Sequence, residues 1–216
     1  MRFADAAARL DPFPVRLPAP LASLMPQIVG GPVPPRWQEA PDDRTIQAAC
    51  VLVLLYPDET GDSRVVLIER TTHDGHHSGE VSFPGGKVEP EDRDATATAL
   101  REAQEEVDLD PEQARIRVVG ALEHFWIPVS DFGVTPIVAL AERRPALRAS
   151  DREVARIVEP PVARFLPGAP IELVERTIRG TAVRYGAYAF DGLSIWGATA
   201  RVLSQLGQVL LPPAHA

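Results

Sequence analysis

The stretch from Ser82 to Leu109 constrains this chain more than any other, because it contains three glutamates at helical spacing. Glu102, Glu105 and Glu106 are three and four positions apart, so a helix would carry all three carboxylates on one side. The other side is apolar, with Ala99, Leu100, Ala103 and Val107. Such a helix would pack its apolar side on a core. Its acidic side would be strained, since each like-charged pair destabilises an isolated helix by about 0.2–0.5 kcal/mol.

Two interpretations of this acidic side compete. A hard divalent cation would relieve the repulsion, because Mg²⁺ and Mn²⁺ prefer carboxylate and carbonyl oxygens. A solvated surface is the usual interpretation of a charge run. Gly85 and Gly86 precede the helix and would let backbone amides and carbonyls approach a ligand without interference from a Cβ atom. Their presence favours the cation.

The segment from Gly86 to Leu109 resembles the Nudix box, whose pattern is G, five residues, E, seven residues, R-E-(apolar)-x-E-E-x-G-(apolar). Asp92 stands for the first glutamate, and the interval from Asp92 to Arg101 is one residue longer than the pattern. Asp108 replaces the last glycine. The remaining positions match: Arg101, Glu102, Ala103, Glu105, Glu106 and Leu109. The longer loop with an aspartate resembles the coenzyme A pyrophosphatase branch of the Nudix hydrolases.

A second motif, which precedes the box, also resembles this branch: L-L-T-x-R-[SA]-x3-R-x3-G-x3-F-P-G-G, with a histidine two residues before the lone glycine. The matching positions are Leu67, Arg70, His77, Gly79, Phe83, Pro84, Gly85 and Gly86. Ile68, Thr71 and Gly75 depart from it, and Gly75 replaces an arginine. Arg70 is then the remaining candidate for a phosphate, because a guanidinium group binds phosphate with two parallel hydrogen bonds. The alternative is an arginine that covers the sheet edge.

The resemblance implies an α/β fold, the Nudix α/β/α sandwich with a mixed β-sheet between helices. It also implies a metal-dependent hydrolase with Mg²⁺ or Mn²⁺ held by Glu102, Glu105, Glu106 and the Gly86 carbonyl. Arg101 would pair with Asp92 and orient the helix. The catalytic residues would come from Glu102, Glu105, Arg101 and Glu153, and the general base stays open among the three glutamates. For Glu153, a surface glutamate before a strand is the alternative.

The implied substrate is coenzyme A or acyl-CoA, cleaved at its diphosphate to adenosine 3',5'-bisphosphate and (acyl-)4'-phosphopantetheine. Arg70, His77, Gly85 and Phe125 would contact it, although Phe125 could simply pack in the core. Two other functions stay open. One is a Nudix pyrophosphatase of another nucleoside diphosphate derivative such as ADP-ribose, favoured by Gly75. The other is a non-catalytic Nudix-like ligand sensor, which would need a broken metal cluster or an added DNA-binding domain.

Three histidines in the loop before the box, His73, His76 and His77, raise the question of zinc. Zinc sites usually add cysteines or carboxylates at fixed spacing, so solvated loop histidines are the simpler interpretation.

The composition limits which binding partners and which cellular compartment we expect. The net charge of -8 argues against nucleic acid, whose binding rests on clustered Lys and Arg, and Lys87 is the only lysine. A single cysteine, Cys50, fits a buried core residue in a reducing compartment. No apolar run reaches the length of a membrane span and the N-terminus lacks a signal-peptide core, so we expect a cytoplasmic protein. A homodimer stays possible.

The pattern along the chain predicts two regions: a proline-rich N-terminal arm over residues 1–44, with a short helix over 3–10, and a Nudix domain over 45–210. Within the domain we expect strands over 46–56, 64–70, 116–122 and 134–140, with the first two paired as a hairpin. Residues 123–131 are predicted to form a loop and 160–166 a short helix. A second hairpin over 171–178 and 182–190 would precede a terminal helix that packs on the sheet.

Overall fold

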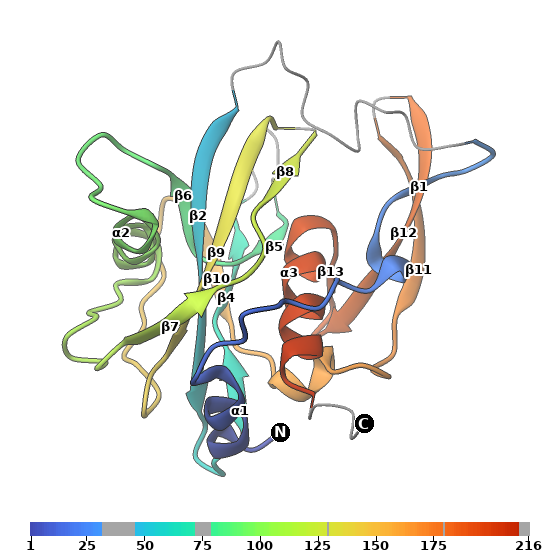
Figure 1. Cartoon of the computed structure of the whole chain (residues 1–216). Helices are drawn as coiled ribbons and strands as arrows, with labels where there is room; N and C mark the ends of the chain where they lie inside the picture. Colours follow the sequence, from blue (N-terminus) through green and yellow to red (C-terminus); the bar gives the residue numbers. More distant parts are fainter. Residues whose placement is uncertain (32–45, 72–78, 129, 179, 212–216) are drawn as a thin grey trace.

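The structure, a computed structural model, describes residues 1–31, 46–71, 79–128, 130–178 and 180–211 (Figure 1). Within these ranges the central sheet has the strand order β3-β2-β9-β7, with β6 paired to β2 and β8 to β9. β2 and β9 run parallel and the other pairs antiparallel, so the sheet is mixed. Its strands are β2 (Gln47–Pro57), β3 (Ser63–Val65), β6 (Gly85–Lys87), β7 (Arg117–Ala121), β8 (Phe125–Ile127) and β9 (Phe132–Leu140).

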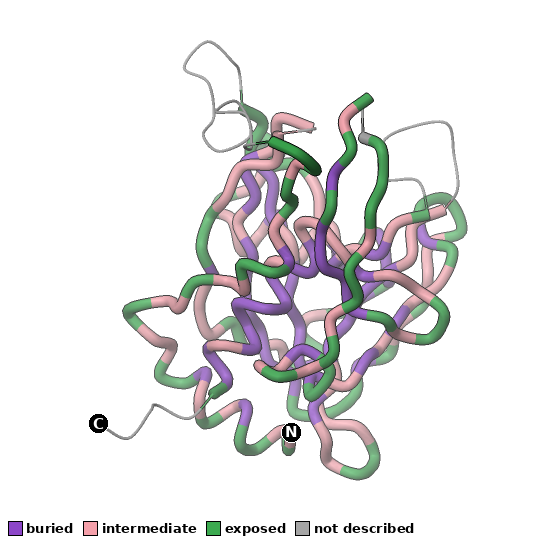
Figure 2. The backbone as a smooth tube through the Cα atoms, turned by 90° about the vertical axis from the view of Figure 1, so that its right-hand side faces the viewer, coloured by how far each residue is buried: buried purple, intermediate pink, exposed green. Residues whose placement is uncertain are grey.

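Two helices cover the two faces of this sheet, because β2 is apolar on both. Leu52 and Leu54 belong to the core cluster on the side of α2 (Ala95–Val107), whereas Val53 and Leu55 belong to the cluster on the side of α3 (Gly197–Val209). Figure 2 shows the buried backbone running through the middle of the molecule. The expected α/β/α sandwich is confirmed (Figure 1).

The strand expected over 64–70 is wrong as a single element. Val66 belongs to neither strand, and there the chain passes from the central sheet to another sheet. The side chains still alternate between the two core clusters, with Val65 and Leu67 in one and Val66 and Ile68 in the other. β3 forms the expected hairpin with β2. The second half, β4 (Leu67–Arg70), instead lies between β10 (Val154–Val158) and β5 (Val81–Ser82) in a sheet of its own.

A third sheet lies beyond α3 (Figure 1). The expected hairpin is present as β11 (Glu172–Ile178) and β12 (Thr181–Phe190), with β1 (Gln27–Ile28) on the other side of β12 and β13 (Leu193–Ile195) paired to its end. The predicted terminal helix is confirmed as α3, which packs in the same core cluster as Tyr188 of β12.

The remaining expectations meet mixed outcomes. The strands over 116–122 and 134–140 are confirmed as β7 and β9, and the short helix over 160–166 is a 3-10 helix at Val162–Phe165. The loop expected over 123–131 is wrong at its centre, where β8 extends the sheet beside β9. None of the helices in the described part of the chain combines the length and apolar character needed to cross a bilayer.

The first 31 residues contribute to the core of the molecule. The predicted helix is confirmed as α1 (Phe3–Leu10), whose Leu10 is fully buried. Leu24, in a 3-10 helix at Ala22–Leu24, is also fully buried in the cluster that contains the α3 side chains. This segment therefore shares its apolar contacts with the strands that follow it.

Candidate active site

The acidic helix α2 is fixed at both ends. Asp94 caps its N-terminus, with the side chain accepting a hydrogen bond from the Ala97 amide at 2.8 Å. Asp108 ends it in the left-handed conformation with φ 55°, which aspartate tolerates better than most residues. Ala99, Ala103 and Val107 are buried against β2. The helix therefore turns its carboxylates away from this contact.

Glu102 lies directly against the backbone of Gly86. A Cβ atom on Gly86 would stand 2.5 Å from Glu102 Oε1, and a Cβ on Gly85 would stand 2.4 Å from the Cys50 carbonyl oxygen. Gly85 also has φ +156°, which favours glycine. Both glycines are therefore required by the close approach of strand β6 to β2 and α2.

Glu106 is the buried acid of the site, with a relative exposure of 2%. The Gly85 amide donates to its Oε2 at 2.9 Å, and the Arg70 Nη1 lies 3.2 Å from its Oε1. Burial raises the pKa of Glu106 to about 7, against the opposing effects of the Gly85 amide and Arg70. Burial likewise raises the pKa of Glu102. The desolvated carboxylates of Glu102 and Glu106 therefore both face the diglycine turn.

Arg101 organises the acidic residues around it. Its Nε and Nη2 bind the two carboxylate oxygens of Asp92 at 3.1 and 3.0 Å, which confirms the expected pairing. Nη2 also donates to the Lys87 carbonyl at 2.9 Å, while Nη1 donates to Glu102 at 3.0 Å and Glu105 at 3.3 Å. The hydrogen bonds from Arg101 hold the pKa of Asp92 well below its usual range. Arg101 thus offsets part of the repulsion that the sequence predicts.

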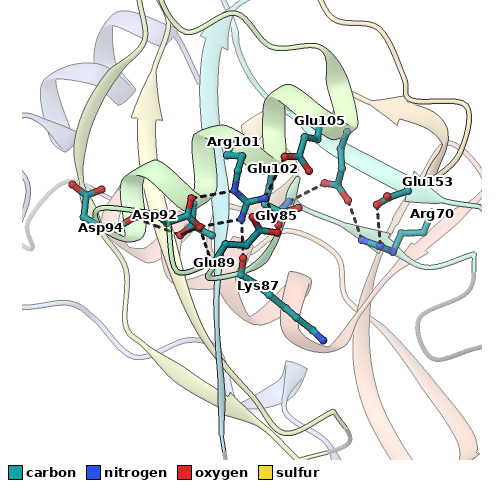
Figure 3. Close-up of polar contacts among 12 residues, drawn as sticks. Arg70, Gly85, Lys87, Glu89, Asp92, Asp94, Arg101, Glu102, Glu105 and Glu153 are labelled. Carbon is teal, nitrogen blue, oxygen red and sulfur yellow. Dashed lines mark hydrogen bonds and ion pairs between the residues drawn. The ribbon is translucent and has the colours of Figure 1, made fainter.

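Glu105, Glu153 and Arg70 lie around Glu102 and Glu106. The Glu105 side chain is 59% exposed and that of Glu153 57% exposed, so both face solvent. Arg70 lies between Glu106 and Glu153, with its Nη2 4.0 Å from Glu153 Oε2 (Figure 3). The fold therefore brings together seven of the residues singled out in the sequence: Arg70, Gly85, Gly86, Arg101, Glu102, Glu105 and Glu106, with Glu153 at their edge.

Phe125 lies apart from this group. It packs with the core cluster on the α3 side of the central sheet, and the Arg201 guanidinium stands 4.8 Å from its ring centre. Glu102 lies on the α2 side, against Gly86. His77, together with His73, His76 and Gly75, lies outside the described residues.

The carboxylate oxygens of Glu102 and Glu106 suit a hard divalent cation that keeps several water ligands. Within the described ranges, no three His, Cys, Asp or Glu side chains already form a cluster that could hold a metal ion. The oxygens of Glu102 and Glu106 are nevertheless close to the diglycine backbone and are poorly solvated. Carboxylates in that state are stabilised by an added positive charge, and Mg²⁺ binds through few carboxylates plus water.

Sequence reasoning missed three contacts that shape the site. The Lys87 carbonyl and the Glu89 amide are backbone groups, for which a sequence carries no signal. Thr98 Oγ1 donates to Asp92 at 2.9 Å. A signal existed for Thr98, because it is a polar residue in the apolar stripe of α2, beside Ala99.

Comparison with known proteins places this geometry in a family. The NUDIX domain family matches residues 46–164. The chain is 34% identical over 179 residues to the uncharacterized Nudix hydrolase NudL of Photorhabdus laumondii, covering 82% of this chain and 90% of that one. It is also 34% identical over 184 residues to the mitochondrial Nudix hydrolase 15 of Arabidopsis thaliana, covering 81% of this chain and 63% of the relative.

Solved structures include a Nudix hydrolase from M. smegmatis, RenU, which covers 55% of this chain and 72% of its own, with 21% identity and a TM-score of 0.47. The sequence matches span both the box helix and the strands that hold it. The chain therefore belongs to the Nudix family of hydrolases, enzymes that cleave diphosphate bonds.

Proposed function

We propose that the chain hydrolyses the diphosphate of coenzyme A or acyl-CoA, releasing adenosine 3',5'-bisphosphate and (acyl-)4'-phosphopantetheine. The observation that supports this proposal is the approach of Glu102 and Glu106 to the Gly85–Gly86 backbone, in a chain whose sequence also resembles the coenzyme A motif. Glu102, Glu105, Glu106 and the Gly86 carbonyl would hold Mg²⁺ or Mn²⁺. When bound, such an ion polarises a phosphoryl group and lowers the pKa of a water ligand.

The protein's own residues would supply position and proton transfer. Arg101 holds the helix, the diglycine strand and the Asp92 loop together, so it is a positioning residue. Glu102, Glu105 or Glu153 would accept the proton of the attacking water. Glu153 stands beside Arg70, and its carboxylate is accessible to a water molecule because the side chain is 57% exposed.

Arg70 is well placed for the substrate. Its guanidinium already lies between two carboxylates at the edge of the site, and it would exchange part of these contacts for a phosphate oxygen. Gly85 would contact the substrate through its backbone. His77 stays a proposal from the motif alone, and Phe125 would act only if the substrate reaches the α3 side of the sheet.

A product assay tests the proposal. Purified protein with coenzyme A and Mg²⁺ should yield both phosphorylated products on chromatography, and EDTA should stop the reaction. Glu105→Gln should lose turnover, whereas Glu112→Gln, an exposed position beyond the helix, should keep it. Intact coenzyme A beside hydrolysed ADP-ribose would reject the proposed substrate.

ADP-ribose and related nucleoside diphosphate derivatives form the second candidate class, because Gly75 replaces an arginine of the coenzyme A motif. Membership in a hydrolase family favours an enzyme over the non-catalytic sensor. We also propose a cytoplasmic location, supported by the lone, buried Cys50. A homodimer stays a proposal for which sedimentation is the test.

A further inference from the structure

A second group of polar residues gathers where α3 begins, away from the carboxylates. Arg176 of β11, Tyr185 of β12, Ser194 of β13 and Trp196 form what we call the helix-start cluster. In the antiparallel register Arg176 lies opposite Val183, and Ser194 lies opposite Ala189. Directly opposed residues share a face, and alternate residues of β12 do too. Arg176, Tyr185 and Ser194 therefore lie on one face of the third sheet.

The start of α3 offers free backbone donors. The first amides of a helix lack intrahelical partners and carry partial positive charge. In α2 the Asp94 side chain satisfies one of them, but the N-cap residue of α3 is Trp196, which makes no side-chain cap. The first turn of α3 also contains no acidic residue. A Cβ built on Gly197 would have no neighbour within 4 Å among the atoms described, so this helix start is accessible.

Tyr185 adds an independent sign of a missing ligand. Its relative exposure is 2%, yet its hydroxyl has no hydrogen-bond partner in the described part of the chain. Buried tyrosine hydroxyls usually have one. The Tyr185 ring stacks on Trp196 at a centroid distance of 4.6 Å, so the unpaired hydroxyl is buried beside the residue that begins the helix. Ser194 Oγ is also buried, and it has no hydrogen-bond partner among the residues that the structure describes.

Arg176 supplies a full positive charge at the same place. Its guanidinium carbon stands 5.6 Å from the centre of the Trp196 ring. Helix amides, a guanidinium group and hydroxyls are all hydrogen-bond donors. Tetrahedral oxyanions are the ligands that suit such a set.

The helix-start cluster is tied to the candidate active site through β5. Thr199, in the first turn of α3, donates to the Val81 carbonyl at 2.9 Å, and the chain reaches Gly85 four residues later. The Glu80 carbonyl accepts from the Arg70 amide at 3.0 Å. Burial raises the pKa of Tyr185, Arg176 opposes this shift and Glu80 adds to it, so its hydroxyl lies within the influence of both charges.

We infer that the helix-start cluster binds a phosphate monoester carried by the substrate at a distance from the diphosphate that is cleaved. This inference rests on the proposed function, because coenzyme A carries such a group on its adenosine ribose. Arg176 takes the place of the cation that the motif lacks at Gly75. The monoester accepts hydrogen bonds from Arg176, from the Tyr185 hydroxyl and from the first amides of α3.

Calorimetric titration in EDTA tests this without turnover. Wild-type protein should bind adenosine 3',5'-bisphosphate about tenfold or more tightly than adenosine 5'-monophosphate, since a charged hydrogen-bonded contact is lost in the second ligand. Arg176→Ala should bring this ratio close to one by weakening the bisphosphate alone. Arg184→Ala is the matched control, because Arg184 is an exposed arginine of β12 on the opposite face, paired with Glu175.

Tyr185→Phe separates binding from folding. Removing an unpaired buried hydroxyl should leave the melting temperature unchanged or higher, whereas the affinity for the bisphosphate should fall. A wild-type ratio near one overturns the inference, and so does an equal loss in Arg184→Ala. If coenzyme A is not hydrolysed, the proposed function fails, but the affinity ratio still decides whether this cluster binds a phosphate monoester.

Discussion

The guanidinium of Arg101 holds both carboxylate oxygens of Asp92, with Nε 3.1 Å from Oδ1 and Nη2 3.0 Å from Oδ2. The same group reaches the Lys87 carbonyl and the Glu102 carboxylate. One side chain therefore connects the loop, strand β6 and helix α2. The Glu102 carboxylate, which faces Gly86, is therefore positioned by this fork before any ligand arrives.

Arg101→Lys should reduce activity without abolishing the fold. A lysine keeps the charge but cannot hold Asp92 with two parallel bonds and reach Lys87 as well. Small displacements in such a site cost about a hundredfold, so kcat/KM should fall by about 10- to 100-fold. Steady-state kinetics and circular dichroism check this. Wild-type kinetics in the variant would show that the charge alone is sufficient.

Gly86→Ala should crowd Glu102 out of place. The added Cβ would lie 2.5 Å from the carboxylate, and the backbone of Gly86 is not in the left-handed region, so crowding alone is tested. Overpacking of this kind costs about 1–3 kcal/mol of unfolding free energy, and turnover should fall with it. Gly31→Ala is the control, because its Cβ would meet a single atom at 3.9 Å. Equal stability and activity in the two variants would contradict the close approach.

The stability of the metal-free protein should fall as pH rises past neutrality. The pKa of Glu106 is raised from 4.5 to about 7, so folding favours its protonated form. This contribution is present below pH 4.5 and is lost as pH rises through 7, by up to about 3 kcal/mol. Urea unfolding in EDTA between pH 4.5 and 8.5 should show the loss in wild type and not in Glu106→Gln. If the unfolding free energy depended on pH in the same way in both proteins, this prediction would be wrong.

Glu159 should have the opposite effect to Glu106: its contribution to folding stability should be lost as the pH falls into the acid range. Burial raises its pKa, but hydrogen bonds from Arg144, with Nη2 at 2.7 Å, and from the Tyr56 hydroxyl outweigh this and leave the pKa below the ordinary value. Its stabilising contribution is present above pH 4.5 and is lost as pH falls through the lowered pKa. Thermal unfolding from pH 5 to pH 3 should therefore be less pH-dependent in Glu159→Gln than in wild type. An unchanged acid dependence would remove Glu159 from this account.

Sequence reasoning reached the parts of the molecule that rest on periodicity. The spacing of Glu102, Glu105 and Glu106 predicted the acidic helix, and the apolar run over 46–56 predicted a strand, because such patterns report which residues are buried. The division of the strand at Val66 was not predicted, because a run of apolar residues does not show where one sheet ends and another begins.

Contacts between distant segments of the chain were harder to predict from the sequence. The aromatic segment at Phe125–Ile127 was expected in a loop, but it pairs with β9, whose sequence lies several residues further on. The fork of Arg101 onto the Lys87 carbonyl depends on a backbone group, which every residue carries alike. Arg70 was recognised from its motif, yet its place between Glu106 and Glu153 required the fold.

A crystal of the protein soaked in Mn²⁺ and coenzyme A tests the central claim most directly, through the anomalous signal of manganese. We predict manganese bound by oxygens of Glu102 and Glu106 beside the Gly86 carbonyl, with a diphosphate oxygen among its ligands. Manganese bound elsewhere, or none at saturating concentration while these carboxylates keep their contacts with Gly85 and Arg101, would contradict the account.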